Sequence, residues 1–218
     1  MPVCFPDPRD ATNEGIVAAG GDLLPETLLA AYRQGIFPWP VEGIKPMLWF
    51  CPAERAVLDF KHLHVPRSLA KIQRREPFRF TIDHDFRAVM SACAQAQRAD
   101  ANGTWITPQM LRAYYNFHRE GYAHSIEAWE GDELVGGLYG VDVEGAFAGE
   151  SMFYKRPNAS KLALLFLVEH LRARGLDWID IQVMTPHMKA FGARLLSRDA
   201  FLRRLARTRA KRLRLFDG

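Results

Sequence analysis

Residues 123–153 read AHSIEAWEGDELVGGLYGVDVEGAFAGESMF, and this stretch decides the fold. Apolar and polar side chains alternate over Ala123–Trp129, and a four-residue turn separates this segment from Leu134–Val141. A second turn, at Gly145, leads into Ala146–Phe153. Three such segments joined by tight turns predict an antiparallel meander of three strands.

Helices are predicted both before and after the meander in the sequence. Thr107 is a good N-cap and Pro108 suits the first turn of a helix, which predicts a helix over Pro108–Glu120. Further expected segments are helices at Phe86–Ala96, Ser160–Arg174 and Asp199–Leu213, and a strand at Trp178–Val183. This order predicts an α+β fold with a mixed, mostly antiparallel sheet, as in acyltransferases of the GNAT type.

The first fifty residues differ from the rest because they are rich in Gly, Pro and aromatic residues. Pro25–Gln34 reads as a short helix that Gly35 ends. We expect a small, loop-rich N-terminal domain over residues 1–55 and a GNAT-like catalytic domain over residues 56–218. Early in the second domain the pattern predicts a basic helix at His64–Arg75 and a strand at Phe78–Ile82.

Composition excludes several classes of protein. Hydrophobic residues make up 48% and charged residues 25% of the chain, which indicates a globular protein with a packed core. No apolar stretch reaches the roughly 20 residues of a membrane helix, and the N-terminus lacks the features of a signal peptide. Cys4, Cys51 and Cys93 suggest no disulfide framework, and the histidines show no metal-ligand spacing. We expect a cytoplasmic protein with no membrane contact and no metal, and we expect it to be a monomer.

The net charge of +4 is concentrated near the C-terminus. Residues 198–214 contain eight Arg or Lys and one acid, Asp199, while the rest of the chain has more acidic than basic residues. A local basic patch is typical of a protein that binds a polyanion, although a solvated helix face has the same pattern. Charge alone leaves both interpretations open.

Two polar side chains interrupt the apolar strand Trp178–Val183. Asp180 and Gln182 are two residues apart, so a regular strand places them on the same face. Burial of an unpaired carboxylate is unfavourable, which favours a polar cleft over a solvent-exposed strand end. Glu150, on a segment that we expect to be bulged after Gly149, could add a second acid. On its own, an ordinary edge-strand glutamate is the simpler interpretation.

The acyl donor is not expected to be coenzyme A, and no cofactor is expected. The turn before the helix Ser160–Arg174 lacks the glycines with which this fold normally binds a coenzyme pyrophosphate. Trp39 and Trp105 lie in turn-like segments, where an aromatic ring can stack on a nucleic-acid base. A lone tryptophan more often completes a local core. Basic residues on the helix His64–Arg75 could contact phosphates.

Eight motifs follow one another along the chain: Gly20-Gly21-Asp22-Leu23, Ala31-Tyr32-Arg33-Gln34-Gly35-Ile36-Phe37-Pro38-Trp39, Gly103-Thr104-Trp105-Ile106-Thr107, His124-Ser125-Ile126-Glu127, Leu134-Val135-Gly136-Gly137-Leu138-Tyr139-Gly140, Gly149-Glu150-Ser151-Met152-Phe153, Asn158-Ala159-Ser160-Lys161 and Asp180-Ile181-Gln182-Val183. In this order they resemble the leucyl/phenylalanyl-tRNA–protein transferase family. They span about residues 15–200, and the ordered set is far more specific than any single motif.

The resemblance implies a two-domain enzyme that transfers Leu, Phe or Met from aminoacyl-tRNA to proteins with an N-terminal Arg or Lys, which marks them for degradation by the N-end rule. It places Asp180, Gln182 and Glu150 at the reaction centre. It implies that the aminoacyl pocket is lined by Leu138, Met152, Leu164 and Leu167. It implies that the tRNA is bound by Tyr32, Trp39, Trp105, Arg67, Arg74 and Arg75.

The donor is an ester and the acceptor an amine, so the protein mainly has to hold the two together. We expect Gln182 to hydrogen-bond the amine or the tetrahedral intermediate, Asp180 to orient Gln182, and Glu150 with Asp180 to attract the basic acceptor residue. Whether Asp180 is a general base stays open. Three alternatives also stay open: a family member that transfers another amino acid, a coenzyme A-dependent N-acyltransferase, and a non-catalytic RNA-binding adaptor.

Overall fold

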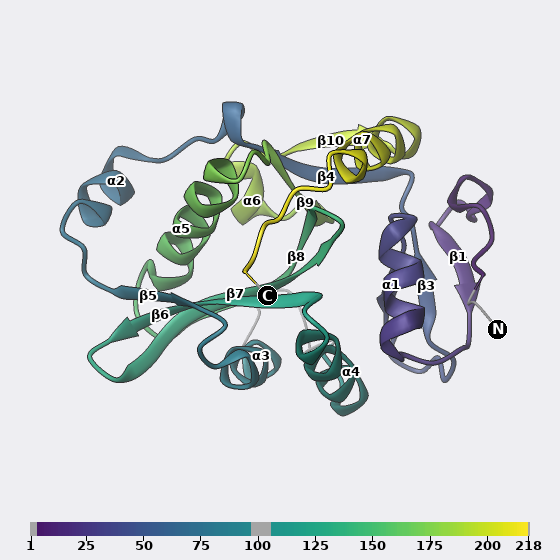
Figure 1. The fold of residues 1–218 in the computed structure, drawn as a ribbon, viewed down its shortest axis with the longest axis horizontal. Helices are drawn as coiled ribbons and strands as arrows, with labels where there is room; N and C mark the ends of the chain where they lie inside the picture. The colour runs from purple at the N-terminus through teal and green to yellow at the C-terminus, as the bar shows by residue number, and fades with distance from the viewer. Residues whose placement is uncertain (1–3, 97–105, 218) are drawn as a thin grey trace.

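The structure is a computed structural model that describes residues 4–96 and 106–217 (Figure 1). Within these residues the strands form a seven-stranded sheet, ordered β10-β4-β9-β8-β7-β6-β5, and a three-stranded sheet, ordered β1-β3-β2. A single hydrophobic core runs through both parts. The predicted α+β class, the mixed sheet and the small N-terminal part are therefore confirmed.

The predicted meander forms the middle of the large sheet. Its strands are β6 (Ala123–Glu130), β7 (Glu133–Val143) and β8 (Ala146–Tyr154), each antiparallel to the next. The predicted strand near residue 80 is β5 (Arg79–Ile82), which adds to the edge beside β6. The alternating pattern thus gave the right strands with ends shifted by one or two residues.

Beyond the meander the sheet becomes mixed. Strand β9 (Trp178–Gln182) runs parallel to β8, with Ala148 opposite Asp180. On its other side β9 pairs with β4 (Glu54–Asp59), and β4 pairs with β10 (Arg194–Ser197). The sequence pattern predicted neither β4 nor β10, because neither alternates strictly between apolar and polar residues. They make β9 an interior strand, and all five of its residues are buried.

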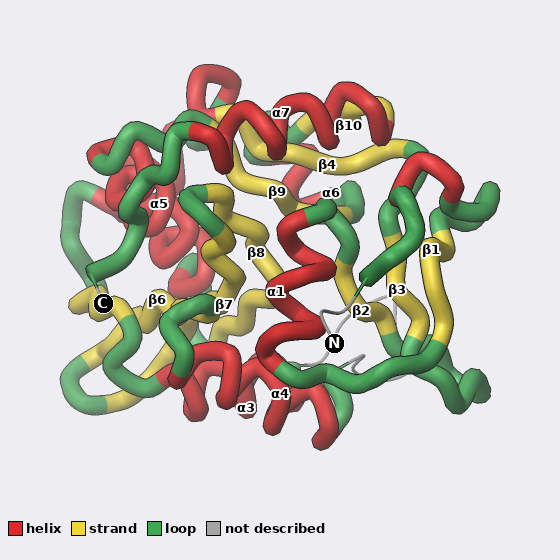
Figure 2. The backbone as a smooth tube through the Cα atoms, turned by 45° about the vertical axis from the view of Figure 1, so that its right-hand side comes forward, coloured by secondary structure: helices red, strands yellow, loops and turns green. Residues whose placement is uncertain are grey.

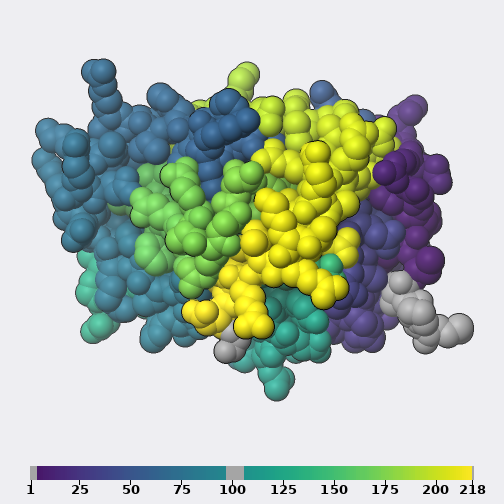
Figure 3. Space-filling view, turned by 45° about the horizontal axis from the view of Figure 1, so that its top comes forward, coloured from purple at the N-terminus to yellow at the C-terminus, as the bar shows by residue number. Residues whose placement is uncertain are grey.

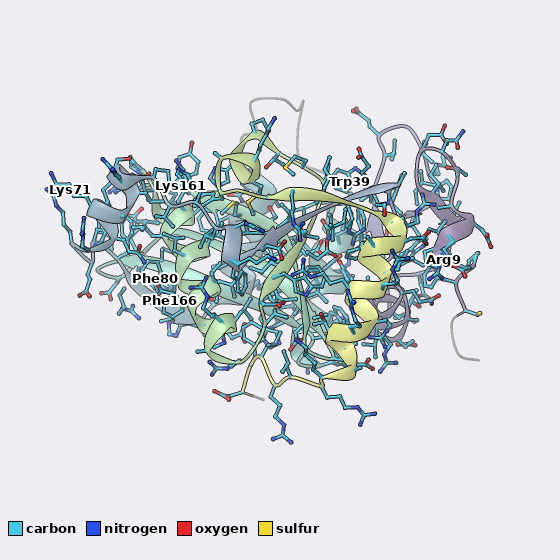
Figure 4. The ribbon with its side chains drawn as sticks, turned by 90° about the horizontal axis from the view of Figure 1, so that it is seen from above. Arg9, Trp39, Lys71, Phe80, Lys161 and Phe166 are labelled. Atoms are coloured by element: carbon cyan, nitrogen blue, oxygen red, sulfur yellow. The ribbon has the colours of Figure 1, made fainter. Side chains whose placement is uncertain are left out.

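Helices cover both faces of the large sheet. Helix α5 (Ala159–Ala173) packs on one face, where Gly136 approaches Ala159 too closely for a side chain. The ring of Phe166 on α5 stacks on that of Phe80 on β5, with 5.2 Å between centroids (Figure 4). Helices α3 (Phe86–Gln95) and α4 (Pro108–Arg119) cover the other face.

The buried motif residue Glu127 explains how α3 begins on its face of the sheet. Its carboxylate accepts hydrogen bonds from the hydroxyls of Ser125 (2.5 Å) and Thr81 (2.7 Å) and from the backbone N–H of Asp85 (3.3 Å). Asp85 is in turn the N-cap of α3. These three donors satisfy a fully buried acid, so Glu127 has a structural role.

The N-terminal part consists of α1 (Pro25–Arg33) and the strands β1 (Ile16–Ala19), β2 (Phe37–Trp39) and β3 (Leu48–Phe50). The helix was predicted, but the small sheet was not. Figure 2 shows α1 running between the small sheet and the large one, and α1 contacts both α4 and β7. This position brings residues of α1 to the centre of the molecule.

Three short or basic segments complete the fold. The predicted helix His64–Arg75 is shorter, α2 (Arg67–Gln73), because the residue before Pro66 is disfavoured in a helix. The predicted C-terminal helix is α7 (Arg198–Ala210), and it stops early because Arg212 has a φ of +48°. Further short helices are α6 (Pro186–Ala190), η1 (Pro8–Asp10) and η2 (Phe60–His62).

A search of the described helices finds none whose length and apolar character would let it span a bilayer. The same residues contain no group of three or more His, Cys, Asp or Glu side chains placed to hold a metal ion.

Candidate functional site

A β-bulge sets the direction of Glu150. Gly140 pairs with Gly149, and its neighbour Tyr139 pairs with Ser151, so Glu150 is the extra residue of β8. A bulge bends the strand and redirects the extra side chain. The bulge expected after Gly149 is confirmed, and it turns Glu150 toward α1 and the end of β9.

Strand β9 ends at Gln182 in an unusual backbone conformation. Gln182 has a φ of +60°, and the N–H of Val183 donates to the carbonyl of Ile181 at 2.7 Å. This three-residue turn is a strained one that non-glycine residues rarely adopt. The side-chain Nε2 of Gln182 then donates to Oε1 of Glu150 at 2.6 Å. The turn therefore joins β8 and β9 through an amide–carboxylate hydrogen bond.

Asp180 is held by Arg55 of β4 in a buried ion pair. Arg55 donates from Nε to Oδ1 at 2.8 Å and from Nη2 to Oδ2 at 2.7 Å. The guanidinium is 1% exposed and lies between the rings of Phe37 and Phe201, at 4.5 and 4.6 Å. Burial, the largest single effect, favours a lower pKa for Arg55, but the charge of Asp180, its hydrogen bonds and other nearby acids together outweigh it and raise that pKa. Arg55 therefore stays charged and fixes the carboxylate.

The structure changes the expected relation between Asp180 and Gln182. Asp180 does not touch the side-chain amide of Gln182; its Oδ1 accepts the backbone N–H of Gln182 at 2.9 Å. Glu150 orients the amide instead. Asp180 thus shapes the strained turn, while Glu150 directs the Gln182 side chain.

Two buried phenols complete the network. The hydroxyl of Tyr32, on α1, donates to Oε1 of Glu150 at 2.7 Å. Its oxygen lies 2.5 Å from the hydroxyl of Tyr114, on α4. Burial, together with the charge of Glu150, raises the pKa of both phenols well above the ordinary value. Both remain protonated, so the chain of hydrogen bonds runs from Tyr114 through Tyr32 to Glu150.

Glu150 is the adaptable acid of the site. Burial raises its pKa to about 7, and the charge of Asp180 adds to the rise, although hydrogen bonds from Tyr32 and Gln182 oppose it. It keeps intermediate solvent exposure, whereas Asp180 is only 5% exposed. An acid with a pKa near neutrality can exchange protons at physiological pH.

Arg55, Asp180 and Tyr32 also border a small internal cavity of about 10 Å³, further lined by residues of β7, β8 and α7. A volume of this size holds about one water molecule. One guanidinium nitrogen of Arg55, Nη1, is buried without a hydrogen-bond partner among the described residues. The cavity therefore belongs to the same polar centre.

The expected pocket residues lie on the α5 side of the sheet. Leu138 of β7 pairs directly with Met152 of β8, and both belong to or pack against the main core. Leu164 and Leu167 are buried on α5, which packs on β7 and β8. Of the four, Met152 alone has intermediate exposure, so it is the member nearest to solvent.

The expected tRNA-binding residues fall into separate places. Tyr32 is 5% exposed and belongs to the Glu150 network rather than to an open surface. Trp39 on β2 is partly exposed, with its ring 6.0 Å from that of Phe37. Trp105 lies outside the described residues. The basic residues at the ends of α2, Arg67, Arg74 and Arg75, are all exposed.

Sequence reasoning missed Arg55 and Tyr114. An arginine directly before the apolar run Ala56-Val57-Leu58 was a signal, because a buried charge needs a partner and Asp180 was already a candidate acid. Tyr114 lies on the buried stripe of α4 with Met110 and Phe117, and a buried phenol needs a hydrogen-bond partner. Only the fold shows which partners these are.

The centre contains two acids and an amide. Arg55 holds Asp180 in place, Glu150 has a pKa of about 7, and Glu150 orients the side-chain amide of Gln182. Such a set can accept a proton from a nucleophile and hydrogen-bond a polar intermediate. These groups are of the kind that enzymes use to transfer an acyl group to a nucleophile.

Comparison with known proteins gives the family. The leucyl/phenylalanyl-tRNA protein transferase family matches residues 57–206, and the N-terminal domain of the same family matches residues 21–53. The chain therefore belongs to the leucyl/phenylalanyl-tRNA protein transferase family, a family of aminoacyltransferases.

Individual relatives agree with the family match. The chain is 52% identical to the leucyl/phenylalanyl-tRNA–protein transferase of Anaeromyxobacter sp. (strain K) over 203 residues, 93% of this chain and 87% of the relative. It is 48% identical to that of Desulfatibacillum aliphaticivorans over 206 residues, 94% and 88% of the two chains. For Chromohalobacter salexigens the values are 52% over 202 residues, 92% and 78%.

Among solved structures, L-PGS from Bacillus licheniformis is similar over 69% of this chain and 48% of that one, with 12% identity and a TM-score of 0.40. That similarity is too low to carry an argument.

Proposed function

We propose that this protein transfers an aminoacyl group from aminoacyl-tRNA to the N-terminal amine of an acceptor protein, with Glu150, Gln182 and Asp180 at the reaction centre. The observation that carries the assignment to these residues is the buried hydrogen-bond network that joins the ends of β8 and β9. Family membership supplies the reaction, and the network supplies groups suited to it.

The reaction is the attack of an amine on an ester. The amine lone pair forms a bond to the ester carbonyl carbon, and the bond from that carbon to the ribose oxygen breaks. One proton leaves the amine, and one proton reaches the ribose oxygen. An N-terminal amine has an unperturbed pKa of about 7.7–8.0, so part of it is neutral at physiological pH. Holding the two reactants together supplies much of the acceleration.

Glu150 is the proton acceptor in this proposal. Asp180 is poorly suited to it, because both of its oxygens already accept hydrogen bonds, two from Arg55 and one from the backbone of Gln182. Glu150 is more exposed than Asp180 and has a pKa of about 7. It takes the proton of the attacking amine and returns it to the ribose oxygen, which balances the reaction.

Gln182 positions the acceptor amine. Its Nε2 donates to Glu150, while its side-chain carbonyl oxygen makes no hydrogen bond within the described residues. That oxygen can accept a hydrogen bond from an N–H of the acceptor amine. This would direct the lone pair of the amine nitrogen toward the ester. Asp180 and Arg55 act through Gln182. They are positioning residues that keep the strained turn at Gln182 in place.

The specificity of the enzyme follows from the surroundings of the centre in the same proposal. The apolar residues Leu138, Met152, Leu164 and Leu167 suit the side chain of Leu, Phe or Met. The negative charges of Asp180 and Glu150 would favour an acceptor that begins with Arg or Lys. The aliphatic residues on α5 fit a flexible apolar side chain. In this proposal, Met152 and its neighbours set the preference among Leu, Phe and Met.

The tRNA is bound outside the centre. Trp39 and Trp105 would stack on the terminal adenosine, beside Tyr32, and Arg67, Arg74 and Arg75 would contact phosphates. In Figure 4, Lys71 of α2 lies far from Trp39, with Lys161 of α5 between them in this view. Contacts spread over such a span suit a macromolecular donor.

The wider proposal concerns the setting of the enzyme. We place it in the cytoplasm, as a monomer that needs no cofactor. Residues 1–55 are proposed as the small domain and residues 56–218 as a GNAT-like catalytic domain; the boundary falls within β4, two residues after its start. The order of the meander, α5 and a parallel β9 supports the GNAT-like description.

A transfer assay tests the function directly. The protein is mixed with an Arg-leading acceptor protein and with radiolabelled Leu-, Phe-, Met- or Arg-tRNA. Label from at least one of the first three is expected in the acceptor, and none from Arg-tRNA. An acceptor with N-terminal Glu is the matched control and should stay unlabelled. Absence of label from every donor would overturn the proposal.

A further inference from the structure

The basic residues at the C-terminus divide into two sets with different surroundings. Four of them are already paired with other groups of the protein. Arg194 (2.5 Å) and Arg204 both donate to the buried Asp59, Arg198 donates to the carbonyl of Cys51 at 2.9 Å, and Arg209 donates to Glu144 at 2.6 Å. These contacts attach α7 and β10 to the rest of the protein. Arg194, Arg204 and Arg209 are therefore paired with carboxylates, and Arg198 is bound to a backbone carbonyl.

The second set points outward and is unpaired. It consists of Arg203, Arg207, Lys211, Arg212 and Arg214, which we call the α7 cationic strip. All five are exposed, and their side chains make no ion pair or hydrogen bond among the described residues. The first three follow one another at a spacing of four residues, about 6 Å along a helix. They form a row rather than a scatter.

The strip continues past the end of the helix because the tail is held down. Leu215 is fully buried, and Phe216 stacks on His124 at 3.8 Å and on His170 at 5.2 Å. Figure 3 shows α7 and the following residues in yellow, running across one face beside the green α5. Arg212 and Arg214 lie in this segment directly after the helix, and both are exposed.

The inner face of α7 rests on the reaction centre. Phe201 covers the guanidinium of Arg55, which holds Asp180. The side chains of Leu202 and Leu205 lie near Gly35, three residues after Tyr32. When the reactive end of a donor enters the centre, the rest of that donor must lie on the surrounding surface. Helix α7 forms part of this surface.

We propose that the α7 cationic strip binds the phosphate backbone of the donor tRNA, as a second contact surface beside α2. This inference rests on the proposed function. Every tRNA carries one phosphate per nucleotide, whereas acceptor proteins vary in charge, so a permanent row of cations fits the donor. Contacts of this kind position the nucleic acid without reading its sequence.

The test compares two double variants that remove equal charge. Arg203→Gln/Arg207→Gln removes two members of the strip, and Lys61→Gln/Arg119→Gln removes two exposed cations on η2 and α4. Binding of aminoacyl-tRNA is measured between 50 and 200 mM salt. If each phosphate contact gives a salt slope of about 0.9, it contributes about eightfold at 0.1 M salt relative to 1 M. The strip variant should bind about 5-fold to 60-fold more weakly, with a slope lower by about 2.

Kinetics separate this inference from the function itself. KM for aminoacyl-tRNA should rise in the strip variant, while kcat and KM for the acceptor stay unchanged. With an aminoacyl-adenosine as donor, which has no phosphate backbone, the strip variant should equal the wild type. A wild-type protein that transfers nothing would overturn the proposed function instead.

Three results would overturn the strip assignment while leaving the function intact. They are an unchanged KM and salt slope in the strip variant, an equal loss in the Lys61→Gln/Arg119→Gln control, and a rise in KM for the acceptor in place of the donor. The last result would identify the strip as an acceptor-binding surface. Equal melting temperatures for the two variants exclude misfolding as the cause of any difference.

Discussion

The buried pair of Arg55 and Asp180 gives the strongest stability prediction. Replacement of Arg55 by Met keeps much of its volume between Phe37 and Phe201 but leaves the carboxylate of Asp180 buried without its partner. Breaking a buried pair in this way costs about 3–5 kcal/mol of unfolding free energy. The pair is 1% and 8% exposed at its two side chains, so solvent relieves little of that cost.

Asp180→Asn should cost less, because the amide oxygen can still accept the N–H of Gln182 and the unpaired guanidinium keeps its two aromatic neighbours. The double variant Arg55→Met/Asp180→Asn buries no isolated charge. It should therefore be more stable than Arg55→Met alone, with a coupling between the two changes of about 0.5–3 kcal/mol.

The assay is urea unfolding followed by tryptophan fluorescence. With a slope of about 2 kcal/mol per molar urea, a loss of 3–5 kcal/mol moves the midpoint down by about 1.5–2.5 M. Arg156→Met is the matched control, because Arg156 pairs with Glu130 at 2.9 Å on the surface, with both side chains about half exposed. An exposed pair contributes about 0–1 kcal/mol, so its midpoint should barely move.

The reasoning would be refuted by a shift for Arg55→Met no larger than that of Arg156→Met, or by single-variant costs that add without coupling in the double variant. Either result would mean that Asp180 is not held as a buried carboxylate.

Three further predictions follow from the same centre and its supports. The transfer rate should rise as Glu150 loses its proton around pH 7, the pKa that burial gives this acid. Because that pKa lies above the ordinary 4.5, the folded state binds the proton more tightly than the unfolded state. The unfolding free energy should therefore fall as pH rises from about 4.5 to 7. A Glu150→Gln variant that kept either profile, in rate assays or in urea unfolding across pH, would contradict this. Tyr114→Phe should cost about 1–2 kcal/mol by removing a hydrogen bond from a buried network, and an unchanged melting temperature would argue against the hydrogen bond to Tyr32. Gly35→Ala should destabilise by more than 1 kcal/mol, because Gly35 has a φ of +73° and a Cβ there would lie 2.6 Å from Phe201; Gly121→Ala, at a φ of +80° with open space around it, is the control and should lose less in thermal unfolding.

Local patterns in the sequence determined the elements that alternate strictly or have clear caps. The meander, the start of α4 at Thr107 and Pro108, and the apolar face of α5 all follow from interactions within a few residues. The same local logic failed for β4 and β10, whose strand conformation depends on pairing with segments more than a hundred residues away. It failed also for the small N-terminal sheet, whose strands have three or four residues each.

For the reaction centre, the sequence by itself identified Asp180 and Gln182 as polar residues in an apolar strand, and its ordered motifs identified the family. The tertiary structure decided what each side chain does. It paired Asp180 with Arg55, used a bulge to bring Glu150 to Gln182, and placed Tyr32 in the network instead of on an open surface. These contacts join α1, β4, β8 and β9, and partners for buried charges are chosen by packing in three dimensions, which no local pattern records.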